Sequence, residues 1–95
     1  MKLVRDGLRN VLQDAGEEVF VAPGHLVEPL LRGKLLEELG ELAAAKFQSA
    51  EEYADVLQVL QDLARENQVE WGDVEEARRI KKKDSGGFGI GVVLV

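Results

Sequence analysis

The chain has 95 residues and no cysteine, which excludes disulfide bonds, cysteine-ligated zinc and thiolate catalysis. A single domain over residues 1–95 should bury only about 60–65% of its unfolded surface, so we expect a thin core that is completed in a homodimer or homotetramer. The net charge of -6 opposes binding to nucleic acid or to a membrane surface. The lack of a long apolar run and of an N-terminal signal core predicts a cytoplasmic protein.

Two amphipathic helices are expected in the first half of the chain. The first covers residues 5–15 and ends at Gly16, and a connector follows it. The second starts at Leu26 or Leu30 and runs to Phe47. The apolar positions that define these helices are Leu8, Val11, Leu12 and Ala15 in the first, and Leu31, Leu35, Leu39 and Leu42 in the second.

Two further helices are expected in the second half. Ser49 and Glu52 have the spacing of a capping box, which starts a helix that reaches Glu66. A fourth helix begins near Asp73 and has a densely basic last turn, which the helix dipole favours. The pattern therefore predicts an all-α domain of four helices. The expected buried face of the third helix comprises Tyr53, Val56, Leu57, Leu60, Leu63 and Ala64.

The composition changes at Ser85, where glycines begin to alternate with apolar residues. Gly86 and Gly87 should end the helix. The apolar residues from Phe88 to Val95 are expected to pack on the helices as an extended tail or a short strand, paired with residues 2–4.

Four acidic residues lie at helical spacing in the centre of the chain. Glu38 and Glu41 are one turn apart on the second helix, and Glu52 and Asp55 are one turn apart on the third. If these helices form an antiparallel hairpin, both pairs meet at the edge of the shared core. Two unit charges about 5 Å apart repel by about 3 kcal/mol at an effective dielectric constant of about 20.

A cation would remove this repulsion. Ligands that are all oxygen, without histidine or cysteine, suit a hard ion such as Mg²⁺ or Mn²⁺. The same pattern is also typical of a solvated helix face, and Glu52 can serve the capping box alone. Both interpretations stay open at the level of the pattern.

The acidic residues belong to a longer sequence pattern. The segments Glu37-Glu38-Leu39-Gly40-Glu41 and Glu52-Tyr53-Ala54-Asp55 resemble the EExxE and ExxD motifs of the MazG-like, all-α nucleoside triphosphate pyrophosphohydrolases. Lys34-Leu35, the run from Lys2 to Asp6, and Gly86-Gly87-Phe88 resemble the flanks of a short, phosphoribosyl-ATP pyrophosphohydrolase-like subgroup. The resemblance covers nearly the whole chain.

The resemblance implies that the chain hydrolyses a nucleotide between its α- and β-phosphates, giving a monophosphate and pyrophosphate, with Mg²⁺ or Mn²⁺ as the cofactor. It implies an oligomer and a nucleotide substrate. The metal ligands that it implies are Glu38, Glu41, Glu52 and Asp55.

The candidate catalytic residues are Glu38 and Glu37. Glu37 could orient or deprotonate the attacking water or support a further ion, and an exposed helical glutamate is an equally good interpretation of it. The candidate phosphate-binding residues are Lys34, Lys81 and Arg5, of which Lys81 also fits a solvated helix end.

The sequence departs from the subgroup at Gly7, Ser85 and Gly91, where relatives tend to carry basic residues. It also has Gln58-Val59 where the histidine-pathway enzyme tends to have Tyr-His. Clearing of the nucleotide pool is therefore the expected role, rather than histidine synthesis. The alternative is a catalytically weakened helical oligomer that binds a nucleotide or a protein partner.

Overall fold

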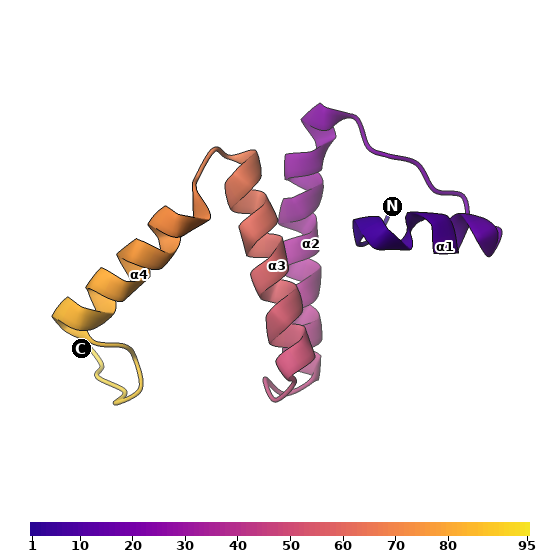
Figure 1. Cartoon of the computed structure of the whole chain (residues 1–95). Helices are drawn as coiled ribbons and strands as arrows, with labels where there is room; N and C mark the ends of the chain where they lie inside the picture. Colours follow the sequence, from indigo (N-terminus) through magenta and orange to yellow (C-terminus); the bar gives the residue numbers. More distant parts are fainter.

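The chain folds into four α-helices and contains no β-strand, as Figure 1 shows. The computed structural model describes residues 1–95. The predicted all-α class with four helices is confirmed. None of the helices combines the length and the apolar character needed to cross a bilayer. The elements are a 3-10 turn η1 at Asp6–Leu8, then α1 at Arg9–Asp14, α2 at Gly24–Ala44, α3 at Ala50–Glu66 and α4 at Trp71–Ser85.

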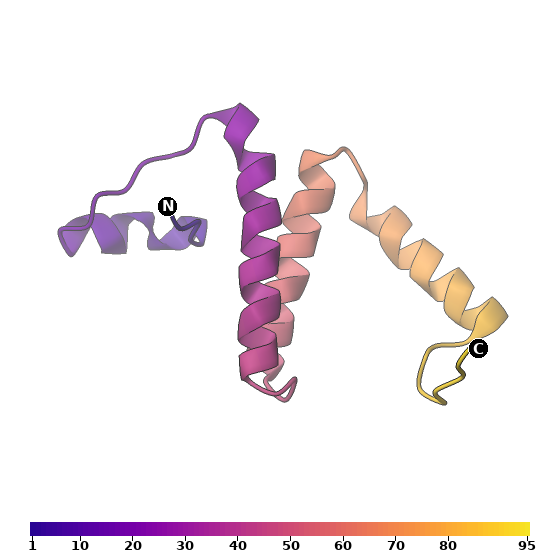
Figure 2. The ribbon, with the colours of Figure 1, turned by 180° about the vertical axis from the view of Figure 1, so that it is seen from behind.

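The helices α2 and α3 run side by side as an antiparallel hairpin, which both ribbon views show (Figures 1 and 2). The turn between them requires positive φ angles of 57° at Lys46 and 59° at Phe47, so α2 ends before Phe47, where the pattern had predicted its end. The Ser49 hydroxyl accepts a hydrogen bond from the Glu52 amide at 3.3 Å, which confirms the predicted N-cap of α3. The Tyr53 hydroxyl donates to the Phe47 carbonyl at 3.0 Å and fastens α3 to the turn.

The hairpin core is a narrow seam between the two helices. Leu31 and Leu42 of α2 are buried, as predicted, and they meet Val59 of α3 in a core that also contains Glu38. Leu39 was expected in the same stripe but is 42% exposed. It lies about 80° round the helix from Leu31, outside the arc that a single neighbouring helix can cover.

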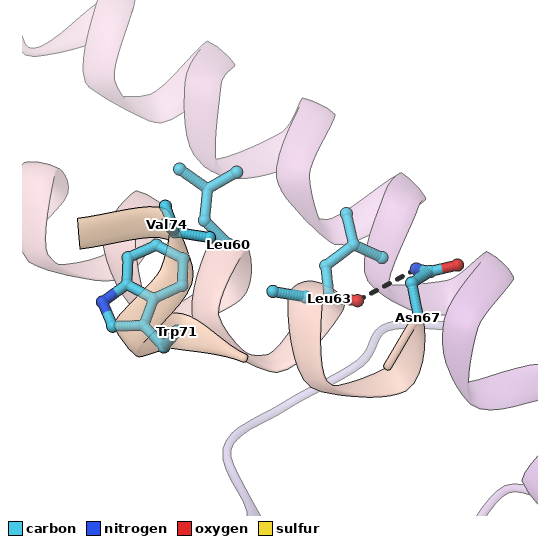
Figure 3. Close-up of a pocket in the computed structure, with 6 residues that line it drawn as sticks. Leu60, Leu63, Asn67, Trp71 and Val74 are labelled. Carbon is cyan, nitrogen blue, oxygen red and sulfur yellow. Dashed lines mark hydrogen bonds between the residues drawn. The ribbon is translucent and has the colours of Figure 1, made fainter. Parts of the chain in front are cut away.

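The predicted buried face of α3 is wrong in half of its members. Tyr53, Leu57 and Leu60 are exposed, whereas Val56 is half-buried and Val59, which the pattern missed, is the residue that α3 buries. The apolar arc of α3 is wider than its contact with α2. The part that faces α2 is centred on Val59, and outside it only the end of α3 near Leu60 is approached by another helix, α4 (Figure 3).

The N-terminal segment is less regular than predicted. The expected helix over residues 5–15 is divided into η1 and a short α1. Gly16 ends it, as predicted, with a φ of +86° that favours glycine. The helix α1 does not pack on α2 or α3. The helix α2 begins at Gly24, earlier than either predicted start.

The C-terminal part of the chain leaves the hairpin. The helix α4 begins at Trp71 rather than near Asp73, approaches only α3 among the helices, and diverges from it along its length (Figure 1). Gly86, with a φ of +80°, follows the helix as predicted. The prediction that the tail packs on the helices is wrong, because Phe88 is 100% exposed and Leu94 is 98% exposed. The divergence of α4 carries the tail away from the hairpin.

Replacing Leu42 by alanine tests the seam. We expect Leu42→Ala to lower the free energy of unfolding by about 2–4 kcal/mol, because it removes one of the few buried side chains. The exposed Val11 on α1 provides a matched control, and Val11→Ala should change the free energy by no more than about 0.5 kcal/mol. Urea denaturation measures both. Equal losses in the two variants would contradict the assignment of the core.

Candidate functional site

The hairpin brings the acidic residues of the two motifs together at one edge of its seam. Glu37, Glu38 and Glu41 project from α2, and their carboxylate oxygens lie within 4.8 Å of one another. Oxygens of Glu38, Glu52 and Asp55 meet the same limit across the two helices. Glu38 belongs to both groups. The structure therefore joins five carboxylates into one acidic cluster, in which Glu38 is the common member.

Glu38 is the buried member of the acidic cluster. It lies seven residues after Leu31 and four before Leu42, so helical geometry places it in the seam rather than at the margin where the pattern had put it. The residue is 5% exposed. One carboxylate oxygen pairs with Lys34 Nζ at 3.0 Å, while Oε2 is buried and has no hydrogen-bond partner. An unsatisfied buried polar atom costs about 1–3 kcal/mol, and more when it is charged.

Glu52 shares this environment from the opposite helix. Its Oε2 is also buried without a hydrogen-bond partner. Burial raises the pKa of the Glu52 carboxyl above its ordinary value of 4.5, and the surrounding negative charges raise the pKa further. In decreasing order, those charges come from Glu41, Asp55, Glu38 and Glu51.

Lys34 is the cation closest to the centre of the acidic cluster. Besides its contact with Glu38, its Nζ lies 3.3 Å from Glu37 Oε1. Burial acts to lower the Lys34 pKa, but the hydrogen bonds and charges of these two glutamates outweigh it and leave the pKa above 10.5. Lys34 therefore stays protonated at neutral pH.

Glu37 is paired with two lysines. Lys34 is one, and Lys2 Nζ is the other, at 3.5 Å. Burial acts to raise the Glu37 pKa, but the hydrogen bonds and charges of Lys34 and Lys2 prevail and hold the pKa below 4.5. A carboxylate with a lowered pKa is a weak base. Glu37 is therefore better suited to orient a water molecule than to remove its proton.

The N-terminal segment reaches the acidic cluster through side chains. Arg5 Nη2 lies 2.6 Å from Asp55 Oδ1, and Lys2 contacts Glu37 as described. Sequence reasoning proposed Arg5 but missed Lys2, although both belong to the run from Lys2 to Asp6 that flanks the motifs. Lys81 is not brought to the acidic cluster, because α4 does not approach α2.

Comparison with known protein families, characterised proteins and solved structures finds no match to this chain.

The raised Glu52 pKa predicts a pH-dependent effect on stability. The folded protein binds this proton more tightly than the unfolded chain does, so Glu52 lowers stability above pH 4.5 and the cost fades as pH falls through the raised pKa. In the absence of metal ions, Glu52→Gln should therefore be more stable than the wild type at neutral pH, and the difference should narrow as pH falls toward 4.5. Thermal melts over this pH range, with a chelator present, measure it.

The exposed Glu17 supplies the control for the loss of one negative charge from an acidic protein. If Glu17→Gln stabilises as much as Glu52→Gln, or if the latter does not stabilise at neutral pH, local repulsion within the acidic cluster is not the cause.

Proposed function

We propose that this chain is a metal-dependent nucleotide pyrophosphohydrolase, similar to the MazG-like enzymes, that cleaves between the α- and β-phosphates. The observation that carries the metal part of this proposal is the Oε2 atom of Glu38, which is buried, has no hydrogen-bond partner and belongs to a side chain that faces Glu52 and Asp55. The two acidic motifs, in order and with their flanks, support the nucleotide part.

The residues of the acidic cluster fit a hard divalent cation. Two buried carboxylate oxygens, one on Glu38 and one on Glu52, lack hydrogen-bond partners. The candidate metal ligands of the acidic cluster are all carboxylate oxygens, which Mg²⁺ and Mn²⁺ prefer. Such an ion supplies positive charge for phosphate oxygens and acidifies a water molecule. The residues that would hold it are Glu38, Glu41, Glu52 and Asp55.

The remaining residues have roles that follow from their charge and position. Lys34 is protonated and held against Glu38, so it provides a fixed positive charge for a phosphate oxygen. Glu37, with its lowered pKa, accepts a hydrogen bond from the attacking water and orients it. The side chain of Arg5 is 59% exposed, whereas that of Lys34 is 15% exposed. Arg5 is therefore freer to move, and it can leave Asp55 and bind a phosphate oxygen when the substrate binds.

A second candidate function is supported by the pairing of the basic residues. Lys2, Lys34 and Arg5 are all engaged by the acidic cluster, and Gly7, Ser85 and Gly91 supply no further charge. A site whose nearby cations are already paired could bind a nucleotide or a protein partner without turning the nucleotide over.

A panel of nucleoside triphosphates, both canonical and modified, distinguishes the two functions when it is incubated with Mg²⁺ or Mn²⁺. Pyrophosphate and nucleoside monophosphate in equal amounts are the expected products. Release of orthophosphate would mean that another bond is cleaved. Saturable nucleotide binding without any product would favour the second function.

Charge-removing substitutions of the same shape test the roles of the ligands. Mutation of a residue that only hydrogen-bonds to a metal ligand lowers activity by about 10- to 100-fold. Glu38→Gln and Asp55→Asn change proposed ligands themselves, so each should lower turnover by at least this much. Helical circular dichroism should persist, because both substitutions relieve repulsion in the metal-free protein. Glu17→Gln, outside the acidic cluster, should keep wild-type turnover. Full turnover by Glu38→Gln would contradict the assignment.

A further inference from the structure

Residues 1–22, which we call the N-terminal arm, have few contacts with the hairpin. The turn η1 and the helix α1 do not approach α2 or α3, and both ribbon views show the arm at one side of α2 (Figures 1 and 2). None of its residues is buried. Its side chains are joined to the hairpin by two ion pairs, formed by Lys2 and Arg5.

The two ion pairs reach opposite helices of the hairpin. Lys2 Nζ lies 3.5 Å from Glu37 Oε1 on α2. Arg5 Nη2 lies 2.6 Å from Asp55 Oδ1 on α3. Glu37 and Asp55 belong to different sets of three carboxylates, which share only Glu38. The two residues between the cations are half-buried. The N-terminal arm therefore crosses the acidic cluster from one helix to the other.

This attachment is weak and depends on the negative charge of the acidic cluster. The side chains of Lys2 and Arg5 are 67% and 59% exposed. Ion pairs between exposed groups are weak and are screened by salt. A segment held by so few contacts opens at a low free energy. A change in the charge of the acidic cluster is therefore sufficient to release the arm.

Asp55 has two roles that oppose each other. It is the partner of Arg5 in the metal-free protein, and it is also a proposed ligand of the divalent cation. A carboxylate that is bound to a cation attracts a guanidinium less strongly, and like charges held close together repel. Arg5 and a divalent cation therefore compete for Asp55.

We propose that the N-terminal arm is a strap over the acidic cluster, which Arg5 and Lys2 close in the metal-free protein and which opens when a divalent cation binds. The proposal rests on the metal part of the proposed function. The competition is reciprocal, because the closed strap lowers the metal affinity by the same factor by which the metal lowers the closure of the strap. The closed strap neutralises part of the cluster, and its opening clears the cluster for the substrate.

The distance between two spin labels measures the opening of the strap. The chain has no cysteine, so Asn10→Cys in the arm and Ala43→Cys on α2 can be labelled selectively, and both positions are exposed. An excess of unlabelled protein restricts the measurement to distances within one chain. Double electron–electron resonance should give a narrower distribution with a chelator than with saturating Mg²⁺. With Arg5→Gln added, the distribution should be broad in both conditions.

Metal affinity provides a second readout. In a titration followed by electron paramagnetic resonance, Arg5→Gln should bind Mn²⁺ about 2- to 5-fold more tightly than the wild type, which corresponds to the loss of one exposed ion pair. Arg9→Gln is the matched control. It removes the same charge from the same arm, at an exposed residue that forms no ion pair, and it should retain the wild-type affinity.

The outcomes distinguish the strap from the proposed function. If the wild type binds Mn²⁺ but Mg²⁺ leaves the distance distribution unchanged, the strap is overturned and the metal site stands. Equal Mn²⁺ affinities of Arg5→Gln and Arg9→Gln would also overturn the strap. If the wild type binds no Mn²⁺, the metal part of the proposed function fails, and the strap fails with it.

Discussion

The carboxylate of Glu38 lies in the seam between α2 and α3, and the acidic cluster is organised around it. The other buried residues of the seam are the apolar Leu31, Leu42 and Val59. A buried carboxylate in such a place is costly unless both oxygens have partners, and Lys34 satisfies only one of them. A leucine in place of Glu38 would continue the apolar stripe of α2. Glu38 therefore lowers the stability of the fold, and it is the one residue that belongs to both sets of three carboxylates. A destabilising residue at such a position is typical of a site kept for ligand binding rather than for stability.

The cations around the acidic cluster reach it from two directions. Lys34 comes from the same helix, one turn before Glu38. Lys2 and Arg5 come from the N-terminal segment, which contacts the hairpin through these ion pairs while α1 itself stays apart. Such exposed pairs contribute little to stability. They neutralise part of the charge of the acidic cluster. Under the proposed function, they also place positive charge where phosphate oxygens would meet this cluster.

The sequence predicted the local features and missed the long-range ones. Spacing within one helix was enough for the Ser49 cap and for the placing of each acidic pair on one helix face, because both follow from 3.6 residues per turn. The convergence of the two pairs required in addition the antiparallel hairpin, which the sequence analysis had set as a condition. The choice of Val59 over Leu57 as the buried residue depends on which half of a wide apolar arc meets the neighbouring helix, and periodicity does not contain that information. Periodicity also does not show how α4 is oriented relative to α3, so it could not predict that α4 diverges from the hairpin. The prediction that the tail packs on the helices failed because of this divergence, which also keeps Lys81 away from the acidic cluster.

A titration of Mn²⁺ without nucleotide, followed by electron paramagnetic resonance, tests the central claim most directly when wild-type protein is compared with Glu38→Leu. The substitution removes the shared carboxylate and continues the apolar seam, and Lys34 keeps its other partner, Glu37, at 3.3 Å, so the fold should persist. Wild-type protein should remove Mn²⁺ from solution with saturation, and Glu38→Leu should leave the ion free although it remains folded. Equal binding by both proteins, or no binding by the wild type, would contradict the role assigned to Glu38.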